Sequence, residues 1–173
     1  MSLAKTTLTI APSSNKQSGF TLIEILITLI ILSIGLLGMA SLQMNSLRSN
    51  QGAYLRSQAS MLAYDMADRM RVNSARAIAG DYNGFDTDGT VPVDPDCMDK
   101  VTGCSEAQQS STDLFEWARR VNGTGNGIAL LPDAKGTITR GAGNLFTIEI
   151  DWSETGDTTN AATNTTFSFN FSL

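Results

Sequence analysis

The acidic residue Glu24 stands in an otherwise apolar run, and its position is the most informative chemical feature of the sequence. From Phe20 to Leu42 it is the only ionisable side chain, and the run is about as long as the ~17–25 residues that a membrane-spanning helix needs. An ionised carboxylate inside hydrocarbon costs at least a few kcal/mol, so Glu24 needs a partner or a function. A cut after Gly19 would create a partner, because the new ammonium on Phe20 would lie one helical turn from Glu24.

The residues before the apolar run have the character of a removable leader. Residues 1–19 are polar, contain Lys5 and Lys16 but no acidic residue, and end in glycine. A secretory signal would have a shorter apolar centre followed by small residues, so a cut after Gly19 instead leaves the hydrophobic helix on the mature protein. The positive-inside rule keeps the basic leader in the cytoplasm and sends the C-terminal portion across the membrane. In an assembly, Glu24 would meet the terminus of a neighbouring subunit, and the penalty for an unpaired charge would fix the stagger between helices.

The segment Gly19–Glu24, read G-F-T-L-I-E with Lys16 upstream and an apolar helix downstream, resembles the class III signal of type IV prepilins and type II secretion pseudopilins. This resemblance implies cleavage between Gly19 and Phe20 by a prepilin peptidase, followed by N-methylation of Phe20. It also implies that Glu24 directs assembly. An ordinary signal anchor with a chance glutamate is the alternative.

A second, narrower resemblance lies further along. The segments Ile31–Gly38 and Leu55–Asn73, and more loosely Trp117 and the run Phe146–Trp152, are similar to minor pilins of the PilV type, also called type IV pilus modification proteins. The resemblance implies a non-catalytic protein that works with other minor pilins and the major pilin to prime pilus assembly. It further implies a tip complex that holds an adhesin and supports adhesion and twitching motility.

These resemblances predict a single-pass inner-membrane protein with a periplasmic C-terminal domain, which becomes extracellular when assembled at the tip of the fibre. Two alternatives stay open. A type II secretion pseudopilin uses the same helix, and a DNA-uptake pilin would bind DNA through arginines at positions 69, 71, 119 and 120.

The composition argues against catalysis and against nucleic-acid binding. The chain of 173 residues has no histidine, which removes the commonest general base and the usual metal ligand. We therefore expect no catalytic residues, no cofactor and no metal. The formal net charge is −5, and loss of the two leader lysines makes the mature protein more acidic still. That sign disfavours contact with a phosphate backbone.

Apolar residues at three-, four- and seven-residue spacing continue the helix beyond Leu42, and no proline occurs from Phe20 to Ala79. The sequence thus predicts one helical rod of about 85–90 Å. We expect a leader (1–19), a transmembrane and fibre-core helix (20–42), an amphipathic helix (43–79) and an α+β globular head (80–173). The fold class is α+β with a type IV pilin-like architecture, in which the long helix packs on a small antiparallel sheet.

Residues 80–110 read as a loop that contains both cysteines of the chain. Cys97 and Cys104 predict a local disulfide in an oxidising compartment, with two free thiols as the alternative. Aspartates at positions 86, 88, 94, 96 and 99 suggest calcium, but the glutamate expected at the twelfth position of an EF-hand loop is missing, so a solvated acidic loop is the default.

The C-terminal part predicts a short helix and three strands. A helix over 113–121 would be capped by Ser111 or Thr112. Alternation predicts a hairpin of strands 137–140 and 145–152, and a last strand over 165–173 with its phenylalanines on one face. The edge of this last strand either pairs within the domain or is completed by another subunit.

Overall fold

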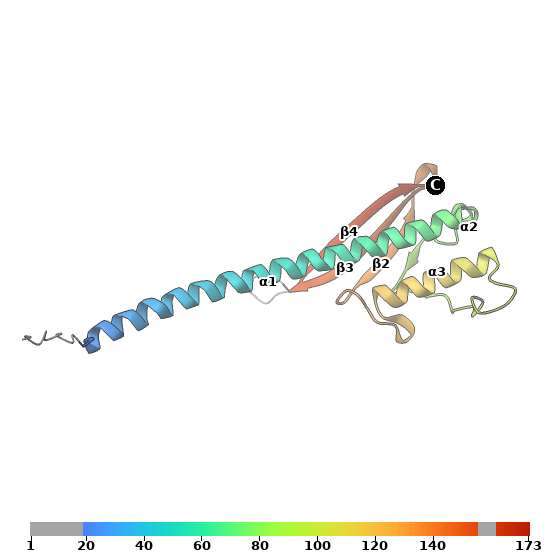
Figure 1. The fold of residues 1–173 in the computed structure, drawn as a ribbon. Coiled ribbons are helices and arrows are strands. Elements are labelled where there is room, and N and C mark those ends of the chain that lie inside the picture. Colours follow the sequence, from blue (N-terminus) through green and yellow to red (C-terminus); the bar gives the residue numbers. More distant parts are fainter. Residues whose placement is uncertain (1–18, 156–161) are drawn as a thin grey trace, which may run out of the picture. The chain divides into compact units, whose positions relative to one another are not determined.

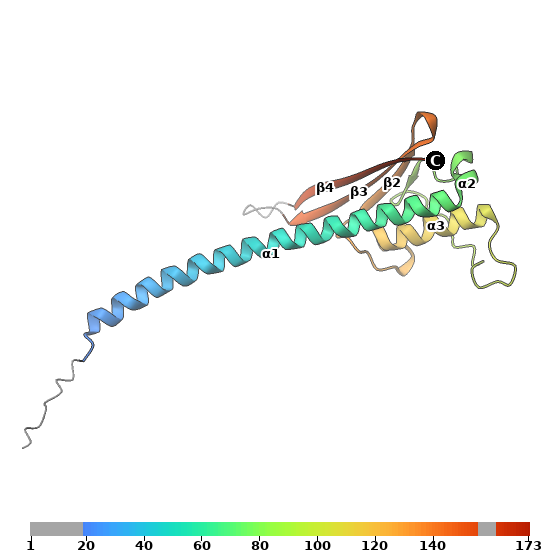
Figure 2. The same ribbon diagram turned by 45° about the horizontal axis from the view of Figure 1, so that its top comes forward.

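The computed structural model describes residues 19–155 and 162–173, so all of the expected leader except Gly19 lies outside the described residues. The predicted α+β fold, with a long helix packed on a small antiparallel sheet, is confirmed (Figures 1 and 2). The chain divides into two compact units after Met44, and the helix α1 runs through the division. The elements are α1 (Leu22–Val72), α2 (Ser74–Ala79), β1 (Phe85–Asp86), α3 (Glu106–Val121), β2 (Lys135–Arg140), β3 (Leu145–Thr155) and β4 (Ala162–Ser172), with short 3-10 turns at Thr124–Asn126 and Ala142–Asn144.

The helix α1 ends earlier than the sequence predicted. Its 51 residues correspond to a length of about 77 Å, and the helical path breaks at Asn73 before the separate helix α2 begins. The break has a tertiary cause, because the Asn73 side-chain amide donates to the hydroxyl of Tyr82 at 3.2 Å and to the carbonyl of Glu106 at 2.9 Å. The prediction of a continuous helix to Ala79 is therefore wrong, because residues 74–79 form the separate helix α2.

The sheet of the second unit is an antiparallel meander in the order β1-β2-β3-β4. The predicted hairpin is present as β2 and β3, which are joined through the turn Ala142–Asn144. The last strand, β4, pairs with β3 along its whole length, from Leu145↔Ser172 to Thr155↔Ala162. The last strand thus pairs within its own domain along one of its edges.

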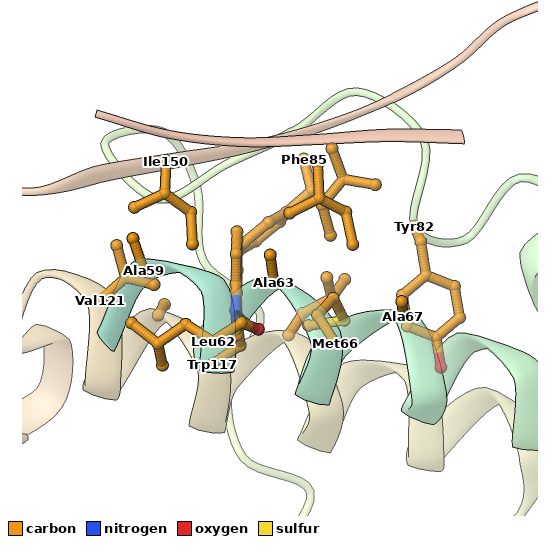
Figure 3. Close-up of a cluster of buried hydrophobic side chains, with 14 of the residues drawn as sticks. Ala59, Leu62, Ala63, Met66, Ala67, Tyr82, Phe85, Trp117, Val121 and Ile150 are labelled. Atoms are coloured by element: carbon orange, nitrogen blue, oxygen red, sulfur yellow. Dashed lines mark hydrogen bonds between the residues drawn. The ribbon is translucent and has the colours of Figure 1, made fainter. Parts of the chain in front are cut away.

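The core of this unit lies between one face of the sheet, the C-terminal part of α1, and α3 (Figure 3). The indole of Trp117 on α3 is fully buried, and its N–H donates to the carbonyl of Leu62 on α1 at 3.0 Å. This bond satisfies the one polar group of a large aromatic side chain inside an apolar core. The buried face of α1 consists of Leu55, Ala59, Leu62, Ala63, Met66, Ala67 and Met70.

The helix α3 begins seven residues before the predicted start at Asp113. Ser105, and neither Ser111 nor Thr112, forms the N-cap. Its hydroxyl accepts from the backbone N–H of Gln108 at 3.3 Å, while the side-chain oxygen of Gln108 accepts from the N–H of Ser105 at 3.0 Å. This reciprocal capping box satisfies two N–H groups that a helix start would otherwise leave unpaired. The segment 80–110 is accordingly not all loop.

Candidate assembly site

The predicted processing and assembly residues lie together at the start of α1. Gly19 and Phe20 directly precede the helix, and the side chain of Phe20 is 81% exposed. Glu24 lies in the first turn, where its backbone N–H donates to the carbonyl of Thr21 at 3.1 Å and lies 3.4 Å from the Thr21 hydroxyl. Thr21 thus caps the helix. This role of Thr21 was not predicted from the sequence, although a threonine three residues before a glutamate is a recognised helix-start pattern.

The cap alone does not account for the carboxylate. A negative side chain in the first turn of a helix gains roughly 0.3–1 kcal/mol from the helix dipole. Placing the same charge in hydrocarbon costs at least a few kcal/mol. An ionised Glu24 in hydrocarbon would therefore need a nearby cation, and the ammonium on Phe20, four residues earlier, is the one that cleavage after Gly19 would supply. The assembly role of Glu24 and the cleavage at Gly19–Phe20 stay predictions.

The N-terminal part of α1 presents a continuous apolar surface. Of the described helices, only α1 is long and apolar enough to cross a membrane, and its most apolar 18-residue window has a mean hydropathy of 2.5 with none of its residues buried. Every residue from Phe20 to Leu42 is exposed. An uncovered apolar surface of this length needs lipid or other apolar helices as its surroundings.

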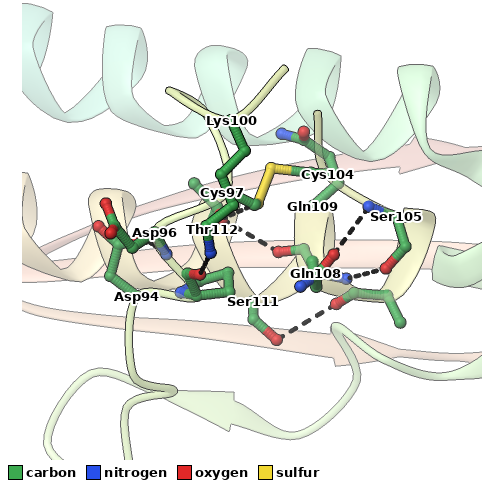
Figure 4. Close-up of a disulfide and its surroundings, with 12 residues drawn as sticks. Asp94, Asp96, Cys97, Lys100, Cys104, Ser105, Gln108, Gln109, Ser111 and Thr112 are labelled. Atoms are coloured by element: carbon green, nitrogen blue, oxygen red, sulfur yellow. Dashed lines mark hydrogen bonds between the residues drawn. A yellow bond between two sulfur atoms is a disulfide. The ribbon is translucent and has the colours of Figure 1, made fainter. Parts of the chain in front are cut away.

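The predicted disulfide between Cys97 and Cys104 is present, with Cα atoms 5.0 Å apart (Figure 4). It lies in the second unit, whereas Glu24 belongs to the first. Cys97 is buried, and its sulfur lies 3.8 Å from the hydroxyl of Thr112 on α3. Cys104 immediately precedes the N-cap Ser105. The disulfide therefore links the irregular segment before α3, at Cys97, to the start of that helix.

Comparison with known proteins identifies the family. Residues 14–40 match the family model described as the prokaryotic N-terminal methylation motif, and residues 41–115 match the model described as type IV pilin Tt1218 (Tt1218-like). This chain belongs to the type IV pilins. No curated protein and no solved structure gives a significant match. The methylation motif implies processing by a prepilin peptidase, membrane anchoring and assembly with other pilins. Pilins are structural proteins rather than enzymes.

The aspartates that suggested calcium, at positions 86, 88, 94, 96 and 99, do not form a cluster of metal ligands among the described residues. No group of three or more potential metal ligands occurs among the residues that the structure describes. Instead the ammonium of Lys135 on β2 lies 2.8 Å from Asp86 and 3.8 Å from Asp88. The hydrogen bond from Lys135 lowers the pKa of Asp86, and the same bond raises the pKa of Lys135. A lysine thus pairs with two of the five aspartates that suggested calcium.

An ion-pair network joins α1 to α3 in the pilin head. Arg69 on α1 contacts Asp65 at 3.0 Å on its own helix, and reaches Asp113 at 3.2 Å and Glu116 at 3.1 Å on α3. Asp65 in turn pairs with Arg120 of α3 at 2.6 Å. Burial lowers the pKa of Arg69, but the three carboxylates more than offset this and raise it above its ordinary value. The network fixes the register of the two helices.

Asp113 is the most buried member of this network. Its side chain is 2% exposed, and it accepts hydrogen bonds from the Tyr82 hydroxyl at 2.7 Å and the Gln109 amide at 2.9 Å. Burial and the bond to this carboxylate both raise the pKa of Tyr82. This role of Asp113 was not predicted from the sequence, because Tyr82 and Arg69 lie 31 and 44 residues away from it along the chain.

The arginines that the DNA-uptake alternative requires are engaged with other groups. Arg69 and Arg120 belong to the ion-pair network. Arg71 pairs with Asp68 at 2.6 Å, while its guanidinium carbon also lies 5.2 Å from the centre of a phenylalanine ring on β4. The guanidinium carbon of Arg119 lies 5.6 Å from the ring centre of Phe115. Contacts of this kind hold arginine side chains on the surface of the domain.

Proposed function

We propose that this type IV pilin is a minor pilin, which enters the pilus or primes its assembly within a tip complex that supports adhesion and twitching motility. The observation that carries its entry into a fibre is Glu24, the only ionisable side chain in the exposed apolar run from Phe20 to Leu42, placed in the first turn of α1 directly after the predicted cleavage site. The minor role is supported by the segment Leu55–Asn73, which resembles PilV-type pilins and lies within the Tt1218-like match.

The proposed mechanism uses the charge of Glu24 twice. After cleavage, the ammonium of Phe20 neutralises Glu24 within one subunit and lets the helix rest in the inner membrane. On assembly, the terminus of the incoming subunit pairs with Glu24 of its neighbour. A mismatch in stagger leaves a carboxylate unpaired in apolar surroundings, and removal of one partner from a buried ion pair costs roughly 3–5 kcal/mol. That penalty selects one stagger among many that apolar packing alone would permit.

The proposed location follows from the same elements. The leader stays in the cytoplasm, residues 20–42 form the membrane and fibre-core helix, and the disulfide-bonded head lies in the periplasm until assembly carries it outside. The partners are the prepilin peptidase, other minor pilins, the major pilin and a tip adhesin.

Two measurements test the proposal. Mass analysis of the membrane-extracted protein should find a chain that begins with methylated Phe20. The variant Glu24→Ala should be processed yet at least tenfold depleted in sheared fibres, whereas Glu149→Ala, which removes an exposed charge from β3, should enter fibres normally. Equal incorporation of both variants would contradict the charge-pair mechanism.

A genetic test separates the proposed pilus role from that of a type II secretion pseudopilin. Deletion of the gene should abolish surface pili and twitching while exoprotein secretion continues. The opposite result, with pili intact and secretion lost, would identify a type II secretion pseudopilin instead.

A further inference from the structure

The strand β4 forms one edge of the sheet over 11 residues, and it pairs only with β3 in the described part of the chain. The opposite edge is the two-residue strand β1, which is too short to accept another strand. An unpaired edge displays a row of N–H and C=O groups that another extended chain can bind. The outer edge of β4 is therefore the long hydrogen-bonding surface of this sheet.

The ladder pattern identifies the residues that display these groups. The N–H of Ser153 on β3 donates toward the β2 side, to Pro132, so the odd-numbered residues of β3 face β2. The even-numbered residues, such as Ile150, consequently face β4 and pair with its odd-numbered residues, such as Phe167. The backbone groups that face outward from β4 belong to Asn164, Thr166, Ser168, Asn170 and Ser172.

This edge lacks the features by which proteins usually prevent edge pairing. Exposed edges are normally protected by lysine, proline, a bulge or a very short strand. Residues 162–173 contain no charged residue and no proline, and the register with β3 is continuous. The outward-facing residues carry small polar side chains, which let another backbone approach.

The side chains beside the edge favour an incoming strand with one apolar face. Phe167 and Phe169 lie on the α1 side of β4 and are only partly buried. Tyr64 on α1 lies edge-on to Phe169, with ring centroids 4.5 Å apart, and remains 50% exposed. A strand added beside β4 would place alternate side chains over these rings and cover them.

A second copy of the chain fits this edge poorly. Antiparallel pairing of two β4 strands reverses the second head, and with it the C-terminal part of α1 in the same unit, so these parts of the two α1 helices would run in opposite directions. Parallel pairing about a two-fold axis turns the second sheet over, and sets the phenylalanine face of one copy beside the polar face of the other. An extended segment of a different protein has neither constraint.

We propose that the outer edge of β4 receives an extended segment of a different protein, which continues the sheet as an additional strand. The segment alternates apolar side chains, which lie toward Tyr64 and Phe169, with polar side chains on the opposite face. It needs no particular charge, because the edge carries none. The inference rests on β4 alone and does not require the chain to be a minor pilin.

Amide hydrogen exchange on the full chain tests the proposal. The chain is compared when dispersed in detergent and in the assemblies isolated from envelopes and sheared fibres of its host. The outward amides at 164, 166, 168, 170 and 172 should exchange at least tenfold more slowly in the assemblies, while the amides that face β3 are slow in both states. Unchanged exchange at the outward amides would overturn the proposal.

Variants at one residue complete the test. Ser168→Pro removes one outward N–H at a position where an edge strand tolerates proline, and it should abolish the protection of the neighbouring outward amides. Ser168→Ala keeps the N–H and should retain the protection. If Ser168→Pro does not fold, Ser168→Lys serves in its place, because it keeps the backbone N–H and should weaken the docking by adding a charge to the edge. A disulfide-linked dimer of Ser168→Cys in the membrane would show that a second copy occupies the edge, and would overturn the proposal.

The outcomes separate this inference from the proposed function. A chain that enters fibres but shows no protection along β4 contradicts only the strand docking. Protection along β4 in an envelope complex, without entry into fibres, contradicts only the pilus role.

Discussion

Removal of the Asp113 carboxylate should destabilise the head more than any other single charge removal among the described residues. The carboxylate accepts hydrogen bonds from Tyr82, Gln109 and Arg69, and its side chain is almost fully buried. The variant Asp113→Ala leaves the Tyr82 hydroxyl without an acceptor in a buried position. Arg69 keeps Asp65 and Glu116 as partners, so the stabilisation lost at Arg69 is smaller than that lost at Tyr82.

The magnitude follows from these contacts. A hydrogen bond to a charged group contributes about 1.5–3 kcal/mol, and a buried hydroxyl left unpaired costs about 1–3 kcal/mol. The bond from Arg69 counts for less, because its side chain is 25% exposed and solvent screens the pair. We expect Asp113→Ala to lower the free energy of unfolding by about 3 kcal/mol. The matched control Asp68→Ala removes an exposed partner of Arg71 and should cost about 0–0.5 kcal/mol.

Urea unfolding of the full chain in detergent, followed by tryptophan fluorescence, measures both values. The double variant Tyr82→Phe with Asp113→Ala should cost at least 1 kcal/mol less than the sum of the two single variants, because each single change removes the same bond. Equal destabilisation by Asp113→Ala and Asp68→Ala, or strict additivity with Tyr82→Phe, would refute the assignment of Asp113 as the centre of the network.

Three further predictions test other parts of the head. Gly136→Ala should cost about 1–3 kcal/mol in the same assay, because a Cβ there would lie 2.5 Å from the indole ring of α3, whereas Gly141→Ala, with its nearest neighbour at 3.6 Å, should be close to neutral. Burial raises the pKa of Tyr82, so the unfolded state loses its proton first and stability should fall above about pH 10, a fall that Tyr82→Phe reduces. In an NMR titration, Lys135→Ala should raise the lowered pKa of Asp86 toward its ordinary value. The native protein loses stability as acid protonates Asp86, and this acid-induced loss should be smaller in the variant.

The parts of the fold that sequence reasoning predicted are those encoded by neighbouring residues. The alternation of residues 145–152 and 165–173 specifies strands locally, and β3 and β4 form there. The apolar run after Glu24 likewise needs no tertiary information to be read as a helix. Cys97 and Cys104 are the two cysteines of the chain, so no other pairing within it was available to them.

The parts that it missed depend on contacts between distant residues. The end of α1 at Val72 is set by Asn73, whose side chain bonds to groups 9 and 33 residues further on. The start of α3 is encoded locally, by the capping box of Ser105 and Gln108, which precedes the apolar residues of the helix. The prediction placed the cap later, at Ser111 or Thr112. The four-residue spacing of Asp65 and Arg69 is a local helix pair, but the reach of both residues to α3 depends on the packing of two helices.

The helix α1 meets two different surroundings, and this divides the expected effects of mutations. Its most apolar window has no buried residue, whereas the stretch from Leu55 to Met70 supplies the face on which the head is built. A change at Glu24 therefore removes no contact of the head core, so Glu24→Ala should leave the unfolding free energy of the head within about 0.5 kcal/mol of the native value. A change at Met66, such as Met66→Ala, should cost about 2–5 kcal/mol through the cavity that it leaves. If Glu24→Ala abolishes fibre entry and leaves head stability unchanged, the assembly function lies in the N-terminal part of α1. If Glu24→Ala lowers both fibre entry and head stability, the two parts of the helix are not independent.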